Sequence, residues 1–206
     1  MAPRRLTTTL LLLTLLTGCA GEGGREATPP PGSVQAGTTT PRSPAADPTD
    51  AAWVQLMIPM DAQAVLLLDL AARRTSGPRL RSWAARLRSS QVAELTALRG
   101  LRDRMGLPGT DVHEGHDMPG MVTAEDLEDA RVAEGAAFDR LLVTLLHEHL
   151  RRSEQVSRSE SSAGGSAEAR DRARALVTAR GEQLAELTAL RGRDHRVPRP
   201  AGATEV

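Results

Sequence analysis

Histidines and methionines gather in one short stretch of the chain, residues 106–122. Imidazole nitrogen and thioether sulfur together suit copper, because methionine is a soft ligand for Cu(I) and histidine binds either oxidation state. Aspartates in the same stretch can add oxygen ligands. The candidate copper ligands are His113, His116, Met118 and Met121. The alternative interpretation is a polar loop that happens to hold two histidines.

Further polar side chains fall on or beside apolar helical stripes. His149 lies on one such stripe, where a hydrogen-bonded core histidine is commoner than a metal ligand. Carboxylates that point into a helical bundle can bind metal, as in ferritin-like sites. The candidates for inward polar groups are Gln91, Glu94, Gln183 and Glu186. Di-iron sites also use Glu-x-x-His pairs, which this sequence lacks.

Motifs of common enzyme classes are missing from the sequence. It has no nucleophile elbow, phosphate loop or zinc-protease motif. We therefore expect a protein that is not an enzyme.

The elements that must position these residues are organised by a repeat. The octapeptide Ala93–Gly100 returns letter for letter as Ala185–Gly192, and a glutamine stands two residues ahead of each copy. Such a repeat predicts an all-α, ferritin-like antiparallel four-helix bundle made of two repeated helix pairs. The helix pairs are expected at 50–105 and 123–193, with the connector 106–122 between them. Leu95 and Leu187 are then equivalent buried positions.

Each predicted helix shows apolar residues at the 3.6-residue period. Asp50 is expected to cap the first helix. Pro59 either kinks this helix or begins it, and we favour the kink because the stripe continues on both sides. Thr123 is expected to cap a third helix that reaches residue 156. Arg180 and Gly181 interrupt the fourth stripe.

Composition excludes several partners. The 206 residues hold 26 basic and 26 acidic side chains, so no net charge draws the chain to nucleic acid. Without tyrosine, and with one phenylalanine and two tryptophans, it cannot stack many bases. We expect no nucleic-acid partner and a core of leucine, alanine and valine.

The only cysteine, Cys19, follows a basic start and the apolar run Leu10–Leu16. This pattern is typical of a secretory signal, and Leu16–Cys19 resembles the lipobox of bacterial lipoproteins. The resemblance implies a signal peptide at 1–18 and a lipid on Cys19 that anchors the protein to the membrane outside the cytoplasm. An ordinary secretory signal is the alternative. A disordered tether (19–48), the bundle (49–193) and a disordered tail (194–206) would follow.

Several motifs together resemble the domain-of-unknown-function family 305 (DUF305), a group of exported ferritin-like four-helix proteins. They are Met57-Ile58-Pro59, His116–Met121, Gly135 with Phe138-Asp139, and the repeated Gln-x-x-Glu. Because some members bind copper, the resemblance implies metal binding. Met60 and Asp61 stand where the family has paired histidines, His149 matches the first histidine of its second pair, and Leu150 replaces the other. Met60, Asp61 and His149 are therefore further candidate ligands, in an altered site.

Two functions follow from these observations. The first is a lipid-anchored envelope protein that binds copper weakly through the connector, helped by His149 and Met60. The alternative is a metal-free member of the same fold that acts as an interaction or scaffold protein of the cell envelope.

Overall fold

The structure is a computed structural model that describes residues 46–111, 113 and 117–194. Over these residues the chain forms five helices and no strand, which confirms the all-α prediction. The helices are α1 (Pro48–Arg74), α2 (Pro78–Arg104), α3 (Ala124–Val132), α4 (Gly135–Ala163) and α5 (Ala167–Asp194). Cys19, His116, the expected signal peptide, the tail from residue 195 and most of the tether lie outside the described residues.

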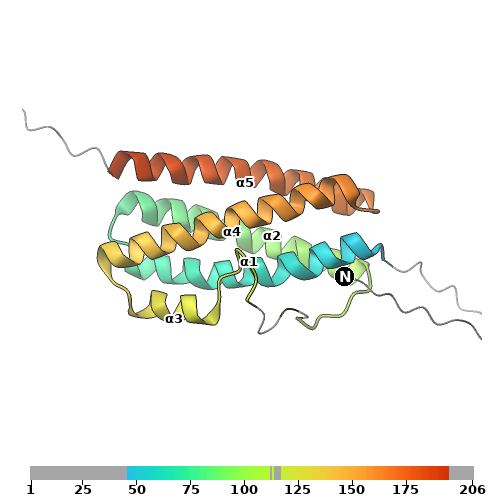
Figure 1. Cartoon of the computed structure of the whole chain (residues 1–206), viewed down its shortest axis with the longest axis horizontal. Coiled ribbons are helices and arrows are strands. Elements are labelled where there is room, and N and C mark those ends of the chain that lie inside the picture. The colour runs from blue at the N-terminus through green and yellow to red at the C-terminus, as the bar shows by residue number, and fades with distance from the viewer. Residues whose placement is uncertain (1–45, 112, 114–116, 195–206) are drawn as a thin grey trace, which may run out of the picture. The chain divides into compact units, whose positions relative to one another are not determined.

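Four long helices, α1, α2, α4 and α5, form the bundle (Figure 1). The main packing pairs are α1 with α2, α4 with α5, and α1 with α4. The α1–α2 and α4–α5 connections are short, so each pair is antiparallel, as helices joined by tight turns usually are. By length and composition α1 could also cross a membrane, but it packs inside the bundle and buries two aspartates, Asp50 and Asp61. We interpret its apolar character as that of a core helix.

The first helix begins earlier than expected, and its cap is Asp47 rather than Asp50. The Asp47 carboxylate accepts hydrogen bonds from the backbone N–H groups of Thr49 and Asp50, at 2.8 and 3.4 Å. The Asp50 side chain instead accepts from the backbone N–H groups of Gly165 and Ser166, both at 2.8 Å. Asp50 thus satisfies free donors ahead of α5, far along the chain. Pro59 lies inside α1, so the helix does not begin there.

The single third helix that the stripe predicted is two helices, α3 and α4, separated at Ala133 and Glu134. Thr123 caps α3 in a reciprocal capping box with Asp126, as the sequence predicted. Gly135 has a φ of 54°, which a right-handed helix cannot continue through. The break lets α3 turn back against α1 and α4 (Figure 1).

The core consists of two apolar clusters. The Trp83 cluster contains Leu67, Leu68, Ala71, Trp83, Ala84, Leu87, Val122, Leu127, Ala130, Phe138, Leu142, Leu146, Leu150 and Leu187. The Trp53 cluster contains Trp53, Val54, Met57, Met60, Leu98, Leu101, Ala169, Ala173 and Leu176. Along α1 and α5 the chain runs from the Trp53 cluster to the Trp83 cluster, and along α2 it runs the opposite way. The predicted equivalent positions, Leu95 and Leu187, are both buried.

Candidate functional site

A layer of buried polar side chains separates the two apolar clusters. Every long helix contributes to it, at the point where the helix passes from one cluster to the other. The members are Asp61 from α1, Gln91 and Glu94 from α2, His149 and Ser153 from α4, and Arg180 from α5, and each is at most 7% exposed. Burying so many polar groups is unfavourable unless they satisfy one another.

Arg180 lies at the centre of this polar layer. Its Nη2 donates to Glu94 Oε1 at 2.6 Å and to Asp61 Oδ1 at 3.2 Å. Its Nε donates to Ser153 Oγ at 2.7 Å, and its Nη1 donates to Gln183 Oε1 at 3.0 Å. A guanidinium is always charged, so a fully buried one requires this many partners. Arg180 therefore links α5 directly to each of the other three long helices.

The two carboxyl groups opposite Arg180 are close enough to influence each other. Burial raises the pKa of Asp61 well above its usual range, and the charge of Glu94 raises it further, while Arg180 lowers it. Asp61 therefore tends to keep its proton. One guanidinium then faces one carboxylate, and the layer carries little net charge. Electrical balance of this kind is what a low-dielectric interior demands.

His149 is a neutral imidazole in this layer. Burial, and then the positive charge of Arg180, lower its pKa to about 3, against a smaller opposing effect of the Gly120 backbone. His149 Nε2 lies 2.9 Å from Gln91 Nε2 and 3.7 Å from Asp61 Oδ1. A neutral ring without a proton on Nε2 accepts from the Gln91 amide, and we assign this tautomer from the partner. The lone pair that would bind a metal is thus already engaged.

The interior does not fit copper. The oxygens of Asp61 and Glu94 face a guanidinium, and Met60 belongs to the apolar Trp53 cluster. Within the part of the chain that the structure describes, no group of three or more His, Cys, Asp or Glu side chains is arranged to hold a metal ion. Asp61 and His149, both candidate metal ligands from the sequence, lie next to each other, but they do so as members of the buried polar layer.

The connector lies against α4. Gly120 has a φ of 78°, and a Cβ atom there would come within 2.3 Å of the Arg152 Cβ. Its close approach holds the connector over the helix that carries His149. His113 lies earlier, in a turn where its backbone N–H donates to Asp111 at 2.8 Å.

Two shallow grooves run beside this contact. One, of ≈ 260 Å³, is lined by Met118 and Met121 together with acidic side chains that include Asp117 and Glu148. The other, of ≈ 460 Å³, contains His147, and the two grooves share Pro119, Gly120 and Glu148. The connector methionines therefore share one surface groove, and a histidine outside the predicted ligand set lies next to it.

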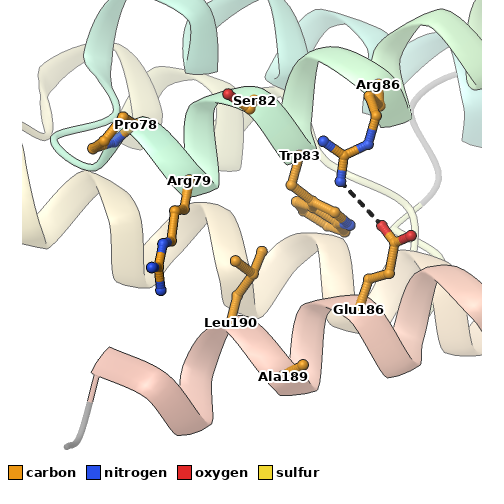
Figure 2. A pocket seen from close by; sticks show the side chains of 8 residues that line it. All are labelled: Pro78, Arg79, Ser82, Trp83, Arg86, Glu186, Ala189 and Leu190. Atoms are coloured by element: carbon orange, nitrogen blue, oxygen red, sulfur yellow. Dashed lines mark hydrogen bonds and ion pairs between the residues drawn. The ribbon is translucent and has the colours of Figure 1, made fainter.

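The prediction that Glu186 is an inward polar group, as Glu94 is, is wrong. Glu94 is buried, whereas the Glu186 side chain is 55% exposed and forms an ion pair with Arg86 at 3.4 Å. Figure 2 shows Glu186 facing Arg86 across a surface groove of ≈ 580 Å³ that Trp83 and Leu190 also line. Gln183 is half-buried and contacts Arg180. The two copies of the repeat thus bury equivalent leucines but not equivalent glutamates.

Arg180 is the main residue that sequence reasoning missed. We took it as an interruption of the fourth stripe, although it falls at helical spacing between the buried residues Leu176 and Leu187. A further signal was available, because Arg88 precedes Gln91 as Arg180 precedes Gln183. Arg88 itself pairs with Asp69 at the surface, so the repeat alone would not have revealed which arginine is buried.

These features define a class: a helical bundle with a buried, internally neutralised polar layer and a surface connector. The chain belongs to the family described as Domain of unknown function (DUF305), whose model matches residues 50–191. It resembles a solved DUF305 fragment from Deinococcus radiodurans at 20% identity, with a TM-score of 0.65, covering 73% of this chain and 99% of that one.

Other solved structures share the fold. A DUF305 protein from Streptomyces coelicolor that is described as secreted matches at 20% identity and a TM-score of 0.63, over 70% of this chain and 93% of the other. CopM in its Cu(II)-bound form matches at 16% identity and a TM-score of 0.60, over 71% and 97%. No curated protein matches the chain. At these identities the likeness is one of fold.

Proposed function

We propose that this protein is a non-enzymatic, lipid-anchored bundle outside the cytoplasm that binds copper at its connector. The observation that carries the proposal is that Met118 and Met121 line one surface groove against α4, with His147 beside it. Soft sulfur with borderline imidazole favours Cu(I) over zinc. Among the described residues the interior offers no competing site, because Arg180 already engages the carboxyl groups of Asp61 and Glu94.

The location rests on other observations. Leu16–Cys19 resembles a lipobox, and a family member of the same fold is described as secreted. A solved structure of the same fold is described as being in a Cu(II)-bound form, which supports copper as the ligand, although its sequence is only 16% identical. An envelope metal-handling role is consistent with both. The role of Cys19 is a prediction that membrane fractionation tests.

Isothermal titration of the purified protein with Cu(I), under reducing conditions, tests the copper site. We expect measurable binding that zinc does not match. Changing His116 and Met118 together to alanine should weaken binding about tenfold or more, since the change removes donor atoms. Two variants serve as controls: His195→Ala, in the C-terminal tail, and Met57→Leu, which removes a sulfur buried in the Trp53 cluster. Both should bind like wild type.

A second function is favoured by the polar layer itself. An interior neutralised by Arg180 needs no metal, which suits a metal-free interaction or scaffold protein of the envelope. If isothermal titration of wild type with Cu(I) gives no heat of binding, or if the double variant binds Cu(I) like wild type, the connector is a structural loop. The scaffold function then replaces the copper function.

A further inference from the structure

The polar layer contains side chains of the kinds that bind metal ions, although with Arg180 among them they are not arranged to hold one. Asp61 Oδ1 and Glu94 Oε1 both contact one nitrogen of Arg180, and Asp61 Oδ1 lies 3.7 Å from His149 Nε2. Two further buried oxygens, Asp61 Oδ2 and Gln91 Oε1, have no hydrogen-bond partner. Two carboxyl groups therefore contact the end of one side chain, and that side chain is a cation. The His149 imidazole lies next to one of these carboxyl groups, and the Gln91 amide contacts the imidazole in turn.

We propose that Arg180 takes the place of a metal ion in this bundle, so that the polar layer is a latent divalent-cation site closed by a covalently attached positive charge. Its Nη2 is within 3.2 Å of both carboxyl oxygens, a position from which it screens them from any other cation. The site is distinct from the connector, so the inference does not depend on copper binding there.

The donor set indicates which ions the opened layer would take. Two carboxyl groups, of which Asp61 would release its proton on binding, one imidazole and one amide oxygen suit borderline divalent ions such as Zn²⁺ or Co²⁺, whereas Cu(I) prefers sulfur. His149 is neutral and therefore chemically ready to bind once the Gln91 amide turns away. Removing the guanidinium would leave a buried carboxylate uncompensated, which favours the entry of a cation.

The test replaces Arg180 by alanine and titrates the full chain with Co²⁺, whose visible absorption reports bound ligands. Thermal unfolding is measured in parallel with and without Zn²⁺. We expect R180A to bind about one equivalent of Co²⁺ more than wild type, and to show an unfolding temperature that rises with Zn²⁺. Wild type should show neither effect from the interior. The matched control is Arg88→Ala, which removes the equivalent arginine of the first repeat from the surface; it should behave like wild type.

Further variants locate the bound ion and separate it from folding. Adding Glu94→Gln to R180A should abolish both the extra Co²⁺ binding and the stabilisation by Zn²⁺. It should also restore part of the unfolding temperature without metal, because both buried charges are gone. If R180A does not fold alone, refolding with Zn²⁺ should recover it.

The proposal is overturned if R180A binds no more Co²⁺ than wild type or gains no stability from Zn²⁺. Failure to refold even with Zn²⁺ contradicts it equally, since a metal ion then cannot replace the guanidinium. It also fails if His149→Gln in the wild-type background removes bound metal, because the interior would then be loaded with Arg180 in place.

Discussion

Glu160, near the end of α4, is the carboxyl group whose removal should most clearly alter how stability depends on pH. Only 1% of the residue is exposed. Burial raises its pKa to about 7, helped by its interaction with the Asp50 carboxylate and by the negative charge of Asp47, against Arg170. Gly164 closes the site, since a Cβ there would lie 2.2 Å from Glu160 Oε1.

The direction in which Glu160 changes stability with pH follows from proton binding in the folded and unfolded states. In the folded protein Glu160 holds its proton up to pH about 7, whereas in the unfolded chain it loses it near 4.5. The folded state therefore binds more protons in this window, and the free energy of unfolding falls as pH rises from 4.5 to about 7. A tenfold difference in proton affinity is worth about 1.4 kcal/mol, which sets a ceiling of about 3 kcal/mol for Glu160. Glu160 is near the exposed Gly165 turn, where water screens charges, so we expect about 1 kcal/mol.

Two other buried groups also make the free energy of unfolding depend on pH, and their effects have opposite signs. Asp61 has a raised pKa, so its contribution also falls as pH rises. The pKa of His149 is lowered from 6.5 to about 3, so its contribution is present above pH 6.5 and is lost on acidification. The wild-type profile is the sum of these contributions. The difference between wild type and Glu160→Gln isolates Glu160, because the other groups remain.

Urea unfolding at a series of pH values between 4.5 and 7.5 measures this difference. We expect the free energy of unfolding of E160Q to rise by about 1 kcal/mol relative to that of wild type as the pH increases across this range, because the amide never ionises. Glu154→Gln, on the same helix but in a surface ion pair with Arg158, is the control and should run parallel to wild type. If the E160Q and wild-type profiles stay parallel, Glu160 is not protonated in the folded protein and the reasoning is refuted.

Three further predictions concern packing and location. Leu187→Ala should lower the free energy of unfolding by about 3–5 kcal/mol, because Leu187 is fully buried in the Trp83 cluster. Leu95 is 8% exposed, so Leu95→Ala should lower it by about 2 kcal/mol. Equal small losses in chemical denaturation would contradict the assigned core. Gly120→Ala should cost about 2–4 kcal/mol by clashing with Arg152, and an unchanged denaturation midpoint would show that the connector is not pinned there. Cys19→Ser should move the protein from the membrane fraction to the soluble fraction on fractionation; retention in the membrane would place the anchor elsewhere.

The pattern of apolar residues was enough to predict the all-α fold and the antiparallel pairing of its long helices. Helix propensity, periodicity and caps are local, so they can be read from neighbouring residues, as at Thr123. Leu95 and Leu187 were likewise found because both copies of the repeat keep a leucine on the inner face. The break at Gly135 was missed because its cause, a positive φ, is a property of the folded backbone.

Only the tertiary structure decided which polar groups are buried. Both α2 and α5 contain an arginine followed by Gln-x-x-Glu. In α2 the glutamate, Glu94, is buried and the arginine, Arg88, lies at the surface. In α5 the arginine, Arg180, is buried and the glutamate, Glu186, lies at the surface. The two helices therefore turn different polar positions toward the core, and contacts with the neighbouring helices decide which side of a helix is buried. Asp50 shows the same dependence, since its partners at Gly165 and Ser166 are brought to it by packing. Local sequence carries the hydrophobic period, whereas the pairing of buried charges is settled between helices that are distant in the chain.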